Sequence, residues 1–99
     1  MVFDMEEYHY TKKVFSFLLF AHEFALKREQ DVLNESKEAY YQSNNHSFII
    51  GCSGKEGVYI KIWLQSSWKT IYARSYKESS FVEQIKAMEQ DAERILLEG

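Results

Sequence analysis

Residues 47–76 read SFIIGCSGKEGVYIKIWLQSSWKTIYARSY and contain the clearest pattern in the chain. Apolar residues alternate with aromatic or polar ones over residues 58–65, and a similar alternation runs through residues 68–76. Because successive strand side chains point to opposite faces, this period predicts strands with two unlike faces. Turn-forming residues at 54–57 and 66–67 separate three such runs. The stretch therefore predicts a three-stranded antiparallel meander.

The turns and the alternation together predict which faces coincide. We expect Gly54 to face Val58 and Gln65 to pair with Trp68, with Gly57 in the left-handed conformation closing the first turn. The predicted core face is then aliphatic throughout and consists of Phe48, Ile50, Cys52, Val58, Ile60, Ile62, Leu64, Ile71 and Ala73.

The opposite face is predicted to be aromatic and basic, and its members are the candidate binding residues. They are Tyr59, Lys61, Trp63, Trp68, Tyr72, Arg74 and Tyr76. Tryptophan, tyrosine and arginine are the usual anchors of protein interfaces, and aromatic residues on a sheet also stack the bases of single-stranded nucleic acid. A third interpretation is that these rings only stabilise the sheet through cross-strand pairs.

The segments on either side of the meander have helical spacing. A helix is predicted from Thr11, and its apolar arc over residues 15–24 is so wide that the helix is either deeply buried or contacts a second chain. Helix-forming residues continue to Tyr41, but an unbroken helix would be about 45 Å long, against about 30 Å for a domain of this size. We therefore expect a break or bend near residues 30–34.

The last helix has a clear start. Ser79 and Ser80, followed by Glu83, predict a capping box, and the apolar spacing after it extends to about Leu97. The expected architecture is a single α+β domain over residues 1–99, with the order α-β-β-β-α and both helices on the aliphatic sheet face.

That element order resembles the double-stranded-RNA-binding domain. The resemblance is confined to the order, because residues 54–57 read Gly-Lys-Glu-Gly where that family has a Gly-Pro-x-His loop. The last helix likewise begins with Ser79 and Ser80 in place of a lysine cluster. No RNA-binding residue is therefore assigned by this likeness.

Composition and motifs exclude several classes of function. The 99 residues carry a net charge of −3, which gives no bulk attraction to nucleic acid or to anionic membranes. The three histidines and Cys52 lack the spacing of metal ligands, and residues 51–55 fail the phosphate-loop pattern. The single cysteine, the acidic leader and the short apolar run favour a cytoplasmic protein without a membrane segment.

These observations predict a small non-enzymatic module that binds another protein, such as an inhibitor, immunity or regulatory factor, without cofactor or metal. Two alternatives remain at this point. One is single-stranded nucleic-acid binding on the aromatic face, and the other is a structural homodimer formed through residues 15–24 or through an edge strand.

Overall fold

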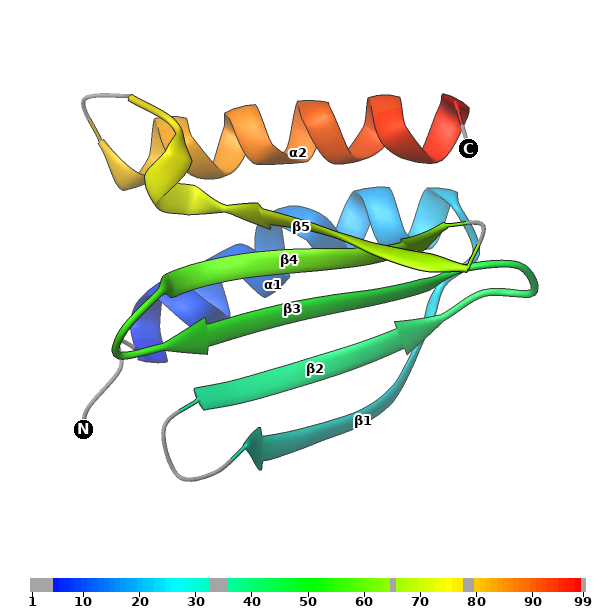
Figure 1. Ribbon diagram of the computed structural model, residues 1–99, viewed down its shortest axis with the longest axis horizontal. Helices are drawn as coiled ribbons and strands as arrows, with labels where there is room; N and C mark the ends of the chain where they lie inside the picture. Colours follow the sequence, from blue (N-terminus) through cyan, green and yellow to red (C-terminus); the bar gives the residue numbers. More distant parts are fainter. Residues whose placement is uncertain (1–4, 33–35, 65, 78–79, 99) are drawn as a thin grey trace.

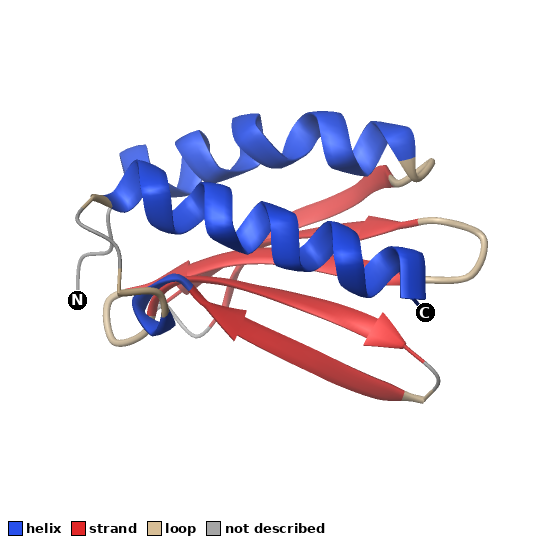
Figure 2. Ribbon diagram, turned by 90° about the horizontal axis from the view of Figure 1, so that it is seen from above, coloured by secondary structure: helices blue, strands red, loops and turns tan. Residues whose placement is uncertain are grey.

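A five-stranded antiparallel sheet forms one layer of the protein, and two helices form the other (Figure 1, Figure 2). The computed structural model describes residues 5–32, 36–64, 66–77 and 80–98. Both helices lie on the same side of the sheet (Figure 2). The α+β class is confirmed, but the expected three-stranded meander is wrong because the sheet contains two further strands.

The elements follow one another in space as they do in sequence. They are α1 (Met5–Ala21), β1 (Ala25–Val32), β2 (Ser36–Gln42), β3 (Ser47–Ser53), β4 (Gly57–Leu64), β5 (Ser67–Tyr72), a short 3-10 helix η1 (Ala73–Ser75) and α2 (Phe81–Glu98). Each strand pairs with the next, so the strand order is β1-β2-β3-β4-β5. The likeness to the order of the double-stranded-RNA-binding domain does not extend to this sheet.

The first helix ends well before Tyr41, because α1 stops in a Schellman motif. The amide of Glu23 donates to the carbonyl of Phe20 over 3.0 Å, and the amide of Phe24 donates to the carbonyl of Leu19 over 2.8 Å. Glu23 has a φ of 62°, a position that glycine usually occupies. The sequence therefore carries no glycine signal where the helix ends.

Residues 25–42 form a β-hairpin, and the expected helical continuation is wrong. The segment is rich in Lys, Arg, Glu and Gln, whose helix preference amounts to only a few tenths of a kcal/mol per residue. Pairing of β1 with β2, and of β2 with β3, outweighs that preference. The antiparallel pairing of β1 with β2 reverses the chain between Val32 and Ser36. Of the break expected near residues 30–34, positions 33 and 34 lie outside the described ranges.

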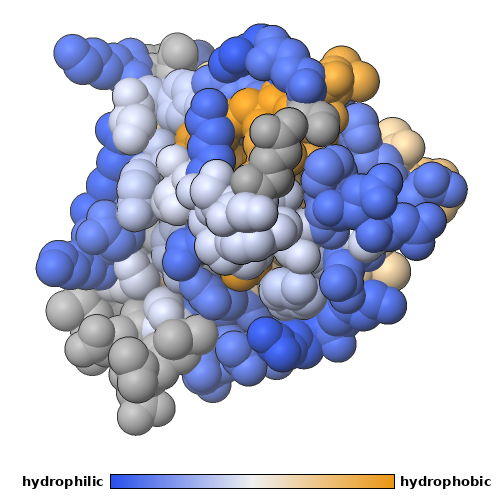
Figure 3. Space-filling model, turned by 45° about the vertical axis from the view of Figure 1, so that its right-hand side comes forward, coloured by the Kyte–Doolittle hydropathy of each residue, from blue (hydrophilic) through white to orange (hydrophobic). Residues whose placement is uncertain are grey.

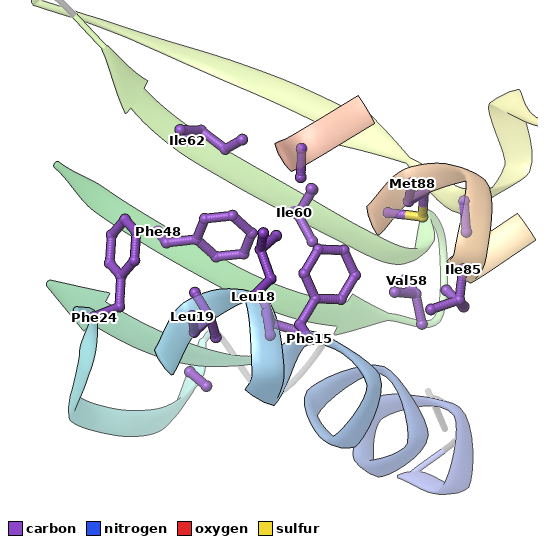
Figure 4. Packing of buried hydrophobic residues seen from close by; sticks show 14 of the residues in the cluster. Phe15, Leu18, Leu19, Phe24, Phe48, Val58, Ile60, Ile62, Ile85 and Met88 are labelled. Carbon is purple, nitrogen blue, oxygen red and sulfur yellow. The ribbon is translucent and has the colours of Figure 1, made fainter. Parts of the chain in front are cut away.

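The core lies between the aliphatic sheet face and the two helices (Figure 4). Phe48 on β3 contacts two rings, with centroid distances of 5.7 Å to Phe15 and 5.8 Å to Phe24. Ile85 and Met88 of α2 are fully buried on the same side. The amide of Glu83 donates to Ser80 Oγ over 3.2 Å, which confirms Ser80 as the cap of α2. The first helix begins before Thr11, where it was predicted to start, and Thr11 is buried inside α1.

Both predicted registers within residues 47–72 are shifted by two residues. Ser53 pairs with Gly57, and Leu64 pairs with Ser67. Each turn keeps the expected number of residues but lies one position earlier in the sequence. Gly57 adopts the expected left-handed φ, of 73°, and Ser66 has a φ of 74°. A shift of two residues leaves every side chain on its predicted face.

The predicted aliphatic face is therefore confirmed as the core side of the sheet. Phe48, Ile50, Cys52, Val58, Ile60, Ile62 and Ala73 are buried, and Leu64 and Ile71 pack against them. Among the described residues, neither helix combines the length and the apolarity needed to cross a membrane.

Candidate functional site

The sheet face opposite the helices is the candidate functional site, and we call it the open face. Neither described helix lies over it (Figure 2). Strand alternation brings side chains from all five strands to this face. Following the registers, they include Arg28, Glu38, Tyr40, Ile49, Tyr59, Lys61, Trp63, Trp68, Thr70 and Tyr72. The side of the molecule drawn in Figure 3 shows hydrophilic surface around pale areas of intermediate hydropathy and orange hydrophobic areas.

Tyr59 occupies the centre of the open face and is locked in place. It lies across Gly51, where the Cβ of any larger residue would stand 2.4 Å from Tyr59 Cζ. The Tyr59 hydroxyl donates to Glu38 Oε2 over 2.6 Å, and the residue is only 7% exposed. Burial and the neighbouring Glu38 carboxylate both raise the pKa of Tyr59, so the hydroxyl stays a donor. The Tyr59 ring therefore stabilises the sheet and offers little surface to a ligand.

Lys61 lies beside this buried pair. Its Nζ is 3.9 Å from Glu38 Oε2 and 5.4 Å from the centroid of the Tyr59 ring. The Glu38 carboxylate is therefore engaged by a hydroxyl donor and has an ammonium group nearby.

Trp63, Trp68 and Tyr72 form the aromatic end of the open face, where Trp68 and Tyr72 are exposed and Trp63 is half-buried. The two indole rings pack edge to face across β4 and β5, with centroids 5.2 Å apart. Tyr72 lies 6.2 Å from Tyr59, centroid to centroid. Trp68 is 41% exposed and Tyr72 37% exposed, although both are large aromatic residues. These rings are held by neighbours on one side and open to solvent on the other.

Arg74 stays at the edge of the open face although it lies in η1 and not in a strand. Its Nη1 donates to the carbonyl of Lys55 over 2.8 Å. Its Nε lies 3.1 Å from the point that a Cβ on Gly57 would occupy. The 3-10 turn therefore folds the guanidinium back over the β3–β4 turn.

Tyr76 does not belong to the open face, and this placement by alternation is wrong. The strand period ends at Tyr72 because η1 follows it. The Tyr76 hydroxyl donates to Asp91 Oδ2 on α2 over 2.6 Å, and the ring packs against the core. Burial and Asp91 raise the pKa of Tyr76. Tyr76 thus fastens α2 to the end of the sheet.

The hairpin that the sequence analysis missed adds two further groups to the open face. The Arg28 guanidinium lies 4.8 Å from the centroid of the Tyr40 ring, a cation–π distance. The Tyr40 hydroxyl and Ser47 Oγ share a hydrogen bond of 2.9 Å. The alternation of Glu38, Tyr40 and Gln42 with Lys37, Ala39 and Tyr41 was the available signal, but helix-forming residues masked it.

Charge is distributed unevenly between the two layers. The open face carries the cations Arg28, Lys61 and Arg74 with Glu38 as its carboxylate. Helix α2 contains five acidic and two basic residues, which give 2 − 5 = −3 and equal the net charge of the chain. The open face is thus the more positive side of an acidic protein.

The described residues do not bring a group of metal ligands together at this face. Groups of three or more His, Cys, Asp or Glu side chains that could hold a metal ion are absent from the described ranges. Cys52 is buried on the helix side of the sheet, away from the aromatic rings. No protein-family model, curated protein or solved structure matches this chain. The open face itself therefore carries the functional inference.

Proposed function

We propose that this protein is a non-enzymatic module that binds an acidic partner protein through its open face, as an inhibitory, immunity or regulatory factor does. The observation that carries this proposal is the exposure of Trp68 and Tyr72, beside the half-buried Trp63, on a rigid sheet with an excess of cations. Fully desolvated tryptophan, tyrosine and arginine side chains supply most of the energy at protein interfaces. The ring positions are preorganised, which lowers the entropy lost on binding.

The charges support an acidic partner. Lys61 and Arg74 flank the aromatic rings, and the carboxylate of Glu38 is already engaged by Tyr59 and Lys61. Complementary potentials accelerate encounter and suppress wrong partners. Binding should therefore weaken as salt is raised, mainly through a slower association rate.

Single-stranded nucleic acid fits the open face less well than a protein does. Trp63 and Trp68 pack edge to face on each other, and Tyr59 is buried, so the rings do not form a row of free stacking platforms. Nucleic-acid binding is therefore the alternative that the experiment must distinguish from protein binding.

The test compares Trp68→Ala and Tyr72→Ala with Leu97→Ala, a control in which a 72% exposed apolar side chain is removed from α2. A partner isolated with the tagged wild-type protein is purified and titrated against each variant by calorimetry. Loss of an aromatic anchor should weaken binding by about 30-fold, the equivalent of about 2 kcal/mol, whereas the control should bind like the wild type.

Two results would contradict the proposal. One is a partner that binds wild type, Trp68→Ala and Tyr72→Ala equally, with all three folded by circular dichroism. The other is quenching of tryptophan fluorescence by a single-stranded oligonucleotide at physiological salt that is lost in Trp68→Ala. That result would assign the open face to nucleic-acid binding.

A further inference from the structure

Strand β5 forms one edge of the sheet, and no described strand pairs with its outer side (Figure 1). Leu64 pairs with Ser67 across a two-residue turn, so these two residues exchange backbone hydrogen bonds. In an antiparallel pair such bonds fall on every second residue, and the backbone groups of the intervening residues point away from the neighbouring strand. The outward residues of β5 are therefore Trp68, Thr70 and Tyr72, and each directs one N–H and one C=O toward the free edge.

The two edges of the sheet are protected to different degrees. The pairing of β1 with β2 is interrupted by a register shift between Leu26 and Arg28, and β1 contains charges of both signs. Bulges and charged side chains are the usual means by which an edge strand avoids pairing with another chain. Strand β5 pairs with β4 in a continuous register, contains no proline and has Lys69 as its one charged residue. The edge at β5 is therefore the more accessible to an added strand.

A strand added to β5 would meet different chemistry on its two sides. On the open face, the exposed rings of Trp68 and Tyr72 lie on either side of Thr70. On the helix side, Lys69 is exposed and Ile71 is half-buried. Because strand side chains alternate, a segment in which apolar and acidic residues alternate would place its apolar side chains beside the rings and its carboxylates beside Lys69.

We propose that the acidic partner contributes an extended segment of this kind, which pairs with β5 as a sixth strand of the sheet. This inference rests on the proposed function and specifies how the partner binds. In strand addition, main-chain hydrogen bonds give affinity and the alternating side chains give specificity. Since Trp68 and Tyr72 belong to β5 itself, one segment would engage both the free edge and the aromatic end of the open face.

The charges at this edge favour an acidic segment over a second copy of β5. If two copies of β5 paired antiparallel about Thr70, Lys69 would face Ile71 of the second copy and lie diagonally across from Lys69 of the second copy. Long side chains reach each other at that diagonal spacing, and like charges across a strand pair destabilise it. Strand β5 contains no acidic residue, and Arg74 adds an exposed cation shortly after it ends. A segment that carries carboxylates matches this edge better than β5 matches itself.

The experiment compares two substitutions at Thr70, whose N–H points away from β4. Thr70→Ala removes the side chain and keeps the N–H, whereas Thr70→Pro removes the N–H and places a ring where the added strand would lie. Proline is tolerated on the outer side of an edge strand, so both variants should fold, which circular dichroism and urea denaturation check. Against the partner purified with the tagged wild-type protein, Thr70→Pro should bind at least about 10-fold more weakly than Thr70→Ala.

Amide exchange on the wild-type protein tests the same contact without a substitution. The probe is a synthetic peptide of about ten residues, the length of a long strand, in which valine and glutamate alternate. At saturation it should slow exchange of the Trp68, Thr70 and Tyr72 amides at least about 10-fold, while the Lys69 and Ile71 amides, already bonded to β4, should change little. A matched peptide of valine and lysine should protect none of them.

Equal binding of the partner by folded Thr70→Pro and Thr70→Ala would overturn strand addition. Unchanged exchange at the three outward amides in the presence of the valine–glutamate peptide would do so as well, even if Thr70→Pro did not fold. If Trp68→Ala and Tyr72→Ala still weaken partner binding in those cases, the proposed function stands and only strand addition fails. A wild-type dimer in sedimentation equilibrium that Thr70→Pro dissociates would instead assign this edge to a second copy.

Discussion

Substitution of Gly51 by alanine tests whether Tyr59 is locked by the missing side chain beneath it. The new Cβ would stand 2.4 Å from Tyr59 Cζ and 2.6 Å from its hydroxyl oxygen. Neither distance is compatible with van der Waals contact, so the ring must leave its position above β3. Gly51→Ala should therefore release both the buried ring and its hydrogen bond to Glu38.

The size of the effect follows from the exposure of Tyr59 and from its partner. If the ring becomes as exposed as Tyr72, it moves from 7% to 37% exposed. This returns roughly 60 Å² to water, which costs about 1.5 kcal/mol at ~25 cal/mol per Å². Loss of the hydrogen bond to charged Glu38 costs about 1.5 kcal/mol more, and alanine returns about 0.5–1 kcal/mol of backbone entropy. The net destabilisation should be about 2 kcal/mol.

Urea denaturation followed by tryptophan fluorescence measures this difference, and the melting temperature should fall by about 8–16 °C. Tyr59→Ala supplies the matched background, because it removes the ring that a Cβ at position 51 would meet. In that background Gly51→Ala should be neutral or stabilising by up to about 1 kcal/mol. The reasoning is refuted if Gly51→Ala costs less than about 0.5 kcal/mol, or costs the same in both backgrounds.

Two further predictions concern α1. Glu23→Gly should stabilise the fold by about 1 kcal/mol, because glycine removes the penalty of a φ of 62°; chemical denaturation checks this, and no gain would contradict it. Glu29 on β1 accepts hydrogen bonds from Lys12 and Tyr8, which lower its pKa below the ordinary 4.5, so its stabilising contribution is present above pH 4.5 and is lost as the pH falls through the lowered pKa. Glu29→Gln should therefore cost about 1 kcal/mol at pH 7, and the gap to wild type should narrow as the pH falls below 4.5 and through the lowered pKa; a gap that does not change with pH would contradict the assignment.

The two faces of the central strands were predictable, although their registers were not. Val58, Ile60 and Ile62 alternate with Tyr59 and Lys61, and strand geometry alone assigns these sets to opposite sides. Register depends on turn conformation, and Ser66 adopts a left-handed φ that its residue type rarely favours. The alternation pattern therefore could not reveal a two-residue error in strand pairing. Such an error leaves every side chain on its predicted face of the sheet.

The hairpin formed by β1 and β2 could not be predicted from local preference. Its residues favour a helix weakly, and its strand character comes from pairing with β3 and from burial of Ala39 in the core. The helix also ends at Glu23 without the usual glycine. Arg28, Glu38 and Tyr40 were consequently missed as members of the open face, because tertiary pairing placed them there.

The open face divides into a locked centre and an exposed end, and the two parts require different experiments. Tyr59, Glu38 and Gly51 fix the shape of the sheet, so substitutions there change stability before they change any contact. Trp68 and Tyr72 are about two-fifths exposed, so their removal should change binding with little loss of stability. A variant of Tyr59 that fails to bind therefore says nothing about direct contact unless its free energy of unfolding is known. Only a binding loss at Trp68 or Tyr72, with stability preserved, would identify the surface that touches a partner.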